Sequence, residues 1–197
     1  LSGTLSANLA AGETVLVSLD NGSTWTTATT TVGQNTWSLA GRTLTASNTL
    51  KVKVSDTAGN DGSVLSQAYV YDTTAPTIAF NSLALSADTG GSNSDFITKT
   101  AAQTITATLS TTPAAGDIVY GSLDNGATWT DITSKVSGTA LSWNGVTLTG
   151  SSTLQLRVVD AAGNSGSSRT QAYTLDTSTP ATPGTPVLAG ASDTGAS

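Results

Sequence analysis

The sequence contains no cysteine, no methionine and no histidine. Without cysteine the chain forms no disulfide and has no thiol nucleophile, and without histidine it has neither a His-based catalytic triad nor a His-centred zinc site. No apolar run approaches the roughly 18–20 residues of a membrane span. The first residues, LSGTLSANLAAGE, lack the basic region and long apolar core of a signal peptide, so we interpret this end as a cut within a longer chain.

Basic residues are also scarce, because Lys and Arg number 7 among 197 residues and the net charge is −6. No basic cluster is present, so we expect no nucleic-acid partner and no membrane insertion. Of the 13 acidic residues, 12 are Asp and Glu13 alone is Glu. Asp favours turns and is a hard oxygen ligand, so this bias predicts many loops and is compatible with calcium sites.

The sequence repeats itself at an offset of 104 residues. VLVSLDNGSTWTT at 15–27 returns as VYGSLDNGATWTD at 119–131, and TLKVKVSDTAGN at 49–60 returns as TLQLRVVDAAGN at 153–164. We therefore predict one module of about 105 residues used serially. The predicted domains are a module without its beginning at 1–75, a complete module at 76–180, and a linker with the start of a third module at 181–197.

Each module has the pattern of strands and turns. LKVKVSD at 50–56 and QTITATLS at 103–110 alternate apolar with polar residues, as half-buried strands do. The runs at 14–19 and 117–123 each lead into Asp-Asn-Gly, which is a strong hairpin signal. No segment shows a helical period, so we predict an all-β fold of tandem immunoglobulin-like sandwiches arranged as a rod.

The four tryptophans allow two interpretations. Trp25 and Trp129 follow the Asn-Gly turns, and Trp37 and Trp143 lie on a later strand. They could form a platform that stacks a ligand, or they could pack against the core and the sheet faces. We favour packing, because Trp25 and Trp129 occupy equivalent positions of the two modules.

Three motifs give the chain a family resemblance. DTTAPT at 72–77, SADTGGSNSDFIT at 86–98 and VVDAAGNSG at 158–166 together resemble the immunoglobulin-like repeat modules of giant bacterial surface adhesins and biofilm-associated proteins, typically exported by type 1 secretion. The resemblance implies a secreted, cell-surface protein with Ca²⁺ bound near the module junctions. It also implies that the neighbouring modules of the chain are the main partners, with a glycan or host-surface ligand bound by other domains.

The residues themselves also favour calcium, which takes six to eight oxygen ligands on loops that can wrap it. Asp88 and Asp95 lie seven residues apart in a loop rich in Gly, Ser and Asn, and the topology is expected to bring carboxylates from the junction and from the last turn to the same end. The predicted metal ligands are therefore Asp72, Asp88, Asp95 and Asp160, helped by carbonyls around Thr89 and Gly90, with Asp176 and Asp193 as the equivalent set at the next junction. Asp56, the counterpart of Asp160, is expected to be metal-free or incomplete.

The alternative for any of these residues is an Asx turn, in which a carboxylate accepts hydrogen bonds from nearby amides. We favour that alternative for Asp20 and Asp124 in the two DNG turns. We predict a non-catalytic, calcium-stiffened extender repeat that projects a distal adhesive domain for cell adhesion or biofilm formation. The competing hypothesis is a carbohydrate- or protein-binding β-sandwich, accessory to an extracellular enzyme. Enzymatic activity itself is not expected, since glycosidases need a carboxyl pair in a cleft and the acids here lie in repeated turns.

Overall fold

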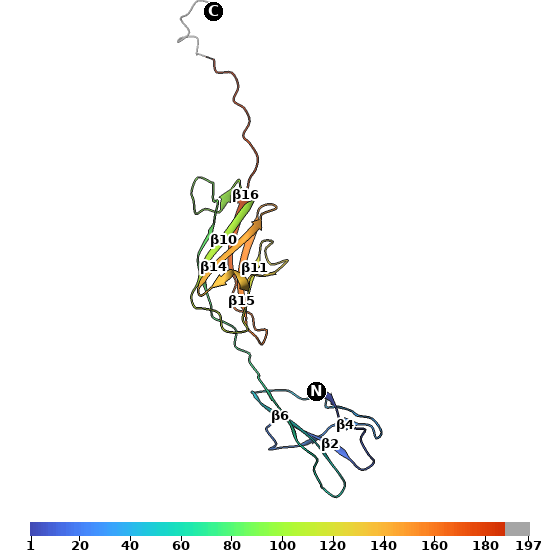
Figure 1. Ribbon diagram of the computed structural model, residues 1–197. Coiled ribbons are helices and arrows are strands. Elements are labelled where there is room, and N and C mark those ends of the chain that lie inside the picture. Colours follow the sequence, from blue (N-terminus) through green and yellow to red (C-terminus); the bar gives the residue numbers. More distant parts are fainter. Residues whose placement is uncertain (188–197) are drawn as a thin grey trace, which may run out of the picture. The chain divides into compact units, whose positions relative to one another are not determined.

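The computed structural model describes residues 1–187, which are organised in two compact units (Figure 1). Unit 1 comprises Leu1–Ala75 together with Ala162–Asn164, and unit 2 comprises Pro76–Ala161 and the chain from Ser165 onward. The regular elements of the described residues are β-strands and one short 3₁₀ helix, η1 (Thr133–Lys135). The predicted all-β fold is confirmed.

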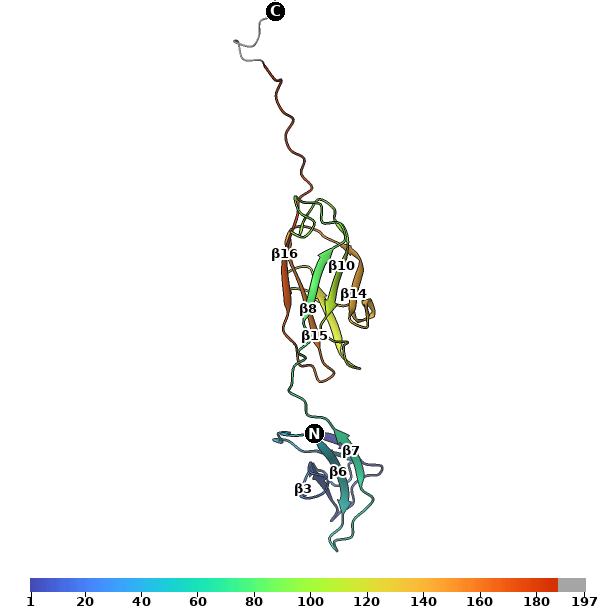
Figure 2. The ribbon, with the colours of Figure 1, turned by 90° about the vertical axis from the view of Figure 1, so that its left-hand side faces the viewer.

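Unit 2 is a sandwich of two sheets (Figure 2). One sheet has the strand order β13-β14-β10-β8, and the other has the order β12-β11-β15-β16-β9. The strands are β8 (Phe80–Leu85), β9 (Ile97–Thr98), β10 (Ala102–Leu109), β11 (Ile118–Ser122), β12 (Thr130–Asp131), β13 (Val136–Ser137), β14 (Ala140–Thr147), β15 (Ser152–Val159) and β16 (Arg169–Leu175). Neighbouring strands are antiparallel except β9, which runs parallel to the end of β16.

The alternation of the sequence decides which side chains form the core of unit 2. Along β10, Gln103, Ile105, Ala107 and Leu109 face inward and are buried. Leu154, Leu156 and Val158 of β15 face them from the opposite sheet and are at most 1% exposed. A strand with period-two patterning buries one face and leaves the other to solvent, as observed here.

Unit 1 repeats this arrangement with fewer strands. A three-stranded sheet has the order β1-β5-β4 and a four-stranded sheet has the order β3-β2-β6-β7. The strands are β1 (Ser2–Thr4), β2 (Thr14–Ser18), β3 (Thr26–Thr27), β4 (Thr29–Thr30), β5 (Thr36–Ser38), β6 (Asn48–Ser55) and β7 (Leu65–Tyr69). Its buried core is Leu9, Val15, Val17, Ala28, Trp37, Leu39 and Val52.

The Asn-Gly turns form as predicted. Asn21 and Gly22 have φ values of 60° and 93°, and Asn125 and Gly126 have values of 58° and 86°. Positive φ at two successive positions is the conformation that Asn-Gly adopts at least steric cost. The turn returns the chain so that β3 pairs antiparallel with β2, and β12 pairs in the same way with β11.

The buried tryptophans lie at different positions of the two units and meet different partners. Trp143 of β14 packs where Gly121 of β11 lacks a side chain, since a Cβ on Gly121 would stand 2.4 Å from the indole. At the corresponding positions unit 1 has Leu39 and Val17, both buried. A large residue opposite glycine has been exchanged for two residues of medium size, so the space is filled in both units.

The second buried tryptophan shows the reverse exchange. Trp37 of β5 lies against Gly3 of β1, where a Cβ would be 2.9 Å from the ring. Unit 2 has Leu141 and Ala107 at these positions, and both are buried. For Trp37 and Trp143, packing in the core is therefore confirmed.

Candidate functional site

The loop at 86–96 carries the predicted Asp88, Thr89, Gly90 and Asp95, and it is fastened to the sandwich by a buried polar side chain. Gln103, 4% exposed, accepts a hydrogen bond from Ala87 N (2.9 Å) through Oε1. Its Nε2 donates to Thr100 O (2.7 Å) and to Ala87 O (3.1 Å). Buried polar groups need such partners, so this glutamine holds both ends of the loop against the core.

Thr98 adds a second buried anchor. It is 1% exposed, and its hydroxyl donates to Ala87 O at 2.6 Å. Thr89 Oγ1 lies 3.3 Å from Thr98 Oγ1 and accepts a hydrogen bond from Lys99 N at 2.9 Å. Sequence reasoning missed Gln103 and Thr98. The available signal was that Gln103 shares its strand face with the apolar positions of β10.

The two carboxylates of the loop differ in how well they are satisfied. Asp88 Oδ2 accepts a hydrogen bond from Phe96 N at 2.9 Å, whereas Asp88 Oδ1 is buried and has no hydrogen-bond partner among residues 1–187. Asp95 accepts from Ile97 N at 3.0 Å and from Ser92 N at 3.3 Å. A buried carboxylate oxygen without a donor costs free energy, so Asp88 offers an oxygen that a cation would satisfy.

Gly90 allows the loop to close on itself. A Cβ at Gly90 would stand 2.8 Å from Ile97 O and 2.9 Å from Asp95 Oδ1. Real Cβ atoms do not approach backbone oxygens so closely, so a side chain at this position would push the loop apart. Gly90 thus sets the close approach of the backbone to the Asp95 carboxylate.

The loop lies at the opposite end of unit 2 from the last turn, so the predicted four-carboxylate set does not assemble. β9, which follows the loop, pairs with Thr174 and Leu175 at the end of β16. Asp160 comes after the far end of β15, whose first residue Ser152 pairs with Tyr173. Eight residues of strand separate the two ends, or roughly 25 Å.

The placement of Asp160 at the beginning of unit 2 agrees with the prediction. A Cβ on Gly166, just beyond that turn, would be 2.6 Å from Pro76 O. The error concerned Asp88 and Asp95, because β8 crosses the whole sandwich before the loop begins. The prediction that Asp88 and Asp95 share a site with Asp160 of the same unit was therefore wrong.

Asp72 and Asp176 occupy equivalent positions and share one local contact. Asp72 Oδ1 accepts from Thr74 N at 2.8 Å, and Asp176 Oδ1 accepts from Ser178 N at 2.9 Å. Hydrogen bonds from the Ser178 hydroxyl and then its backbone amide lower the pKa of Asp176. The N–H of Asp176 donates to Thr98 O at 2.9 Å, so Asp176 lies at the same end of unit 2 as the loop. Asp193 lies outside the described residues.

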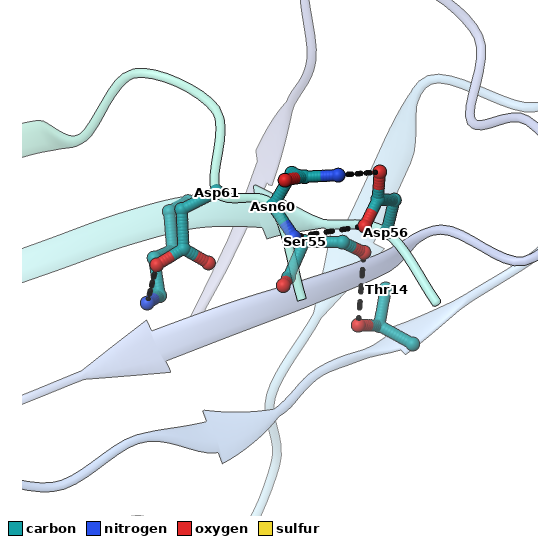
Figure 3. Close-up of polar contacts among 6 residues, drawn as sticks. Thr14, Ser55, Asp56, Asn60 and Asp61 are labelled. Atoms are coloured by element: carbon teal, nitrogen blue, oxygen red, sulfur yellow. Dashed lines mark hydrogen bonds and ion pairs between the residues drawn. The ribbon is translucent and has the colours of Figure 1, made fainter. Parts of the chain in front are cut away.

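Asp56, in the turn that corresponds to that of Asp160, is satisfied by its own turn (Figure 3). Its Oδ1 accepts from Ala58 N (2.9 Å) and Asn60 N (2.8 Å), and its Oδ2 accepts from Asn60 Nδ2 (2.9 Å). The bonds from the Asn60 side chain and then its amide lower the pKa of Asp56. In the second copy of this turn, Asn164 belongs to the short stretch Ala162–Asn164 that groups with unit 1. Its Nδ2 donates to Asp72 O of the same unit at 3.0 Å.

Asp20 and Asp124 are satisfied within their own turns, as predicted, although the amide that each accepts from lies four residues on rather than the two residues of an Asx turn. Asp124 accepts from Thr128 N (2.8 Å), the Thr128 hydroxyl and Ser122 Oγ (2.7 Å), and Asp20 repeats these contacts with Thr24 and Ser18. The Thr hydroxyl, then the Thr amide and the Ser hydroxyl, lower the pKa of each carboxyl from 3.8 to about 2. Hydrogen bonds to the ionised form have this effect.

Trp25 and Trp129 are half-buried, and each has a cation from its own sheet over the ring. Lys53 Nζ lies 4.5 Å from the Trp25 ring centre and also pairs with Asp61 at 2.5 Å. Arg157 lies 3.9 Å from the Trp129 ring centre. A cation–π contact repeated at equivalent positions means that each indole packs against its own sheet.

Two broader observations concern the part of the chain that the structure describes. Within residues 1–187, acidic side chains do not gather in a group of three or more that could hold a metal ion. In the same range, no helix has the length and hydropathy needed to cross a membrane.

Comparison with known proteins identifies the family. Residues 74–177 match a bacterial Ig-like domain family, and residues 4–73 match a second family of the same description. Because the first match spans more than half of the chain, the chain belongs to the bacterial Ig-like domains. No curated protein matches it in sequence.

Two solved structures are similar to the chain at low identity. The FN1–FN3 domains of chicken CNTN1 have 13% identity and a TM-score of 0.41, with 89% of this chain and 66% of that chain covered. The BSP domain of a biofilm associated protein has 16% identity and a TM-score of 0.30, with 90% of this chain and 28% of that chain covered. The present chain thus spans less than two thirds of either structure.

Proposed function

We propose that the chain is a non-catalytic extender segment of a large bacterial surface adhesin, secreted and displayed outside the cell. The supporting observation is that two bacterial Ig-like units follow each other with the same turns, the same turn carboxylates and equivalent cation–π pairs. Turns and packing contacts that recur from one unit to the next are typical of a serial array of one structural module.

We also propose that calcium binds at the loop of Asp88 and Asp95 and stiffens the junction that follows unit 2. The unsatisfied buried oxygen of Asp88 supports this site, and the hard carboxylate and hydroxyl oxygens of the loop match the ligands that calcium prefers. Asp176 begins the segment that leaves this end of unit 2. The loop and Asp176 would hold the ion, and oxygens from the start of the following repeat would tie that repeat to it.

The expected energetic effect is modest. A site with a Kd of about 0.1 mM, in about millimolar calcium, would gain about 1–3 kcal/mol. That is little compared with folding, but it suffices to bias a two-state junction several-fold or more. Outside the cell, where calcium is plentiful, the junction would then be held in one geometry.

Calcium titration of the chain tests this proposal. Calorimetry should detect binding to the wild-type chain, and the Asp88→Asn/Asp95→Asn double variant should lose it. Asp20→Asn/Asp124→Asn is the matched control, because those carboxylates are engaged in their own turns. Equal calcium uptake by both double variants would place the ion elsewhere and contradict the proposed ligands.

Stiffening requires a separate measurement on a complete junction. A tandem of two copies of residues 76–180 contains the loop and Asp176 of the first copy together with the Asp160 turn of the second copy. Small-angle scattering should give a larger maximum dimension with calcium than with chelator. An unchanged dimension would refute the stiffening role while leaving the extender proposal intact.

A further inference from the structure

The outward face of the larger sheet of unit 2 has a cation that lies between two aromatic rings. Tyr120 of β11 and Arg157 of β15 are directly opposite each other in the strand register, so their side chains share a face. Leu156 and Val158, the neighbours of Arg157 in β15, are buried in the core, so that face is the outward one. The guanidinium lies 3.9 Å from the Trp129 ring centre and 5.7 Å from the Tyr120 ring centre.

The equivalent place in unit 1 has a carboxylate in addition to the cation. Lys53, the counterpart of Arg157 at the offset of 104, lies over Trp25 and forms an ion pair with Asp61. The hydrogen bond from Lys53 is the main cause that lowers the pKa of Asp61. A cation has this effect because it stabilises the ionised carboxylate. In unit 1 the cation is therefore satisfied by a ring and a carboxylate together.

Unit 2 has no carboxylate at this position. Ser165 is the counterpart of Asp61 at the offset of 104, and the backbone agrees. Asp61 forms an isolated bridge with Ser55, and Ser165 forms the same bridge with Val159. Among residues 1–187 no acidic side chain forms an ion pair with Arg157, and its Nε is buried without a hydrogen-bond partner. An acceptor supplied from outside would therefore lower the free energy of this guanidinium.

A second difference adds aromatic surface beside the cation of unit 2. Unit 1 has Leu16 at the position of Tyr120, so a second ring is found in unit 2 alone. Tyr120 and Trp129 are both half-buried, so part of each ring system is left to solvent. Aromatic side chains offer an apolar surface with a polar tip, against which the apolar face of a sugar ring can pack.

The charges around Arg157 restrict the kind of anion that fits. Asp131 of β12 is directly opposite Tyr120 and shares its face, and Asp124 lies in the turn that precedes Trp129. These carboxylates would repel a ligand that carries several adjacent negative charges. A ligand with one carboxylate and several hydroxyl groups avoids this repulsion, because its hydroxyls can donate to Asp131.

We propose that Arg157, Tyr120 and Trp129 bind an acidic sugar of the uronate type, set in an otherwise neutral glycan. The sugar carboxylate would accept from the Arg157 guanidinium in the place that Asp61 takes beside Lys53. The sugar ring would lie against the solvent-facing parts of the two aromatic side chains. In unit 1 Asp61 already occupies the cation, so we expect no such site there. This inference does not depend on the calcium site or on the extender role.

A titration of the full chain with methyl glucuronide, followed by NMR, tests the proposal. A chelator is present throughout, so that calcium cannot bridge the sugar and the chain. The indole N–H signal of Trp129 should shift saturably, and that of Trp25 should stay in place. Methyl glucuronamide, which keeps the ring and the hydroxyls but has no charge, should bind at least ten-fold more weakly. No saturable shift at Trp129 would overturn the proposal.

The Ser165→Asp variant tests the place of the carboxylate without altering the core, since Ser165 is exposed. The new carboxylate would occupy Arg157 as Asp61 occupies Lys53, so the affinity for methyl glucuronide should fall at least ten-fold. The matched Ser165→Asn variant has nearly the same shape without the charge and should bind as the wild type does. Equal affinities of the two variants would contradict the assigned carboxylate position.

A peptide distinguishes a sugar from a protein as the source of the carboxylate. A short capped peptide with a single Glu among glycines should bind at least ten-fold more weakly than methyl glucuronide, because it has no ring to pack against Tyr120 and Trp129. A peptide that binds as tightly as the sugar, or more tightly, would overturn the assignment of an acidic sugar.

Discussion

At the scale of single residues, the two units fill one core volume in two ways. Unit 2 combines Trp143 with Gly121, and unit 1 combines Leu39 with Val17. The sum of volumes is kept while the individual residues change. The two members of each pair therefore depend on each other, and replacing one member alone is predicted to disturb the packing.

The substitution Gly121→Val is expected to destabilise unit 2 by about 2 kcal/mol or more, because the added Cβ would stand 2.4 Å from Trp143. Trp143→Leu alone should cost about 2–3 kcal/mol through the cavity it leaves. The double variant reproduces the residue pair of unit 1, so its cost should be smaller than the sum by about 1–3 kcal/mol. Urea denaturation of the three variants measures the coupling, and strict additivity would disprove it.

The carboxylates of Asp20 and Asp124 predict a pH dependence of stability. The pKa of Asp20 and of Asp124 is about 2 in the folded chain, below the ordinary value of 3.8. Their stabilising contribution is therefore complete above the ordinary pKa and is lost as the pH falls through about 2. As the pH is lowered from about 3.8 to about 2, the melting temperature of the wild-type chain should fall. It should fall less in the Asp20→Asn/Asp124→Asn variant, which lacks these carboxylates. Parallel pH profiles for the two proteins would refute this assignment.

At the scale of elements, the loop at 86–96 depends on a residue from a neighbouring strand. Gln103 of β10 satisfies Ala87 and Thr100 from within the core. Gln103 lies on the buried face of β10, where alternate residues are otherwise apolar, and its hydrogen-bond partners come from the loop. The sequence predicted β10 from its alternation, but the pairing of Gln103 required the folded loop.

Gln103→Ala should destabilise unit 2 by about 2–3 kcal/mol, because it leaves several buried backbone groups without partners. Gln67→Ala is the matched control, since the side chain of this exposed glutamine donates to the adjacent Ala68 O and its loss should change stability by less than about 0.5 kcal/mol. Chemical denaturation gives both values. Hydrogen exchange at Ala87 should accelerate in Gln103→Ala, and unchanged exchange there would mean that the loop is held by other contacts.

Most strands were predictable because their signals are local. The apolar alternation in 50–56 and 103–110 and the Asn-Gly turns indicated β6, β10 and two hairpins. The end of the sandwich at which the loop lies was predicted wrongly, because that depends on the path of β8. A strand's direction within a sandwich is a property of its pairing, which no short motif encodes.

At the scale of the whole molecule, the two cores predict unequal stability. The core of unit 2 is closed by β8 and Phe96, whereas that of unit 1 is open over Leu50, Val52 and Val54. Burying less apolar surface leaves a smaller margin against conformational entropy. Unit 1 should therefore unfold before unit 2.

Two core truncations assign the transitions in calorimetry. Val17→Ala should lower only the first melting temperature, and Leu156→Ala should lower only the second, with a cost of about 2–5 kcal/mol in unit 2. Both residues are at most 2% exposed in their own cores. A single transition that both variants shift equally would show that the chain unfolds as one cooperative unit.

The sequence by itself determined the repeat, the all-β class, the turns at Asp20 and Asp124, and the acidic loop as the place to look for calcium. These features are local or are repeated letter by letter, so pattern and side-chain chemistry suffice to find them. Only the tertiary structure decided that Asp88 and Asp95 lie at the far end from Asp160, that Gln103 anchors their loop, and that unit 1 exposes a groove. Each of these depends on which strands pair and in which direction, and long-range pairing is set by the packing of the whole unit.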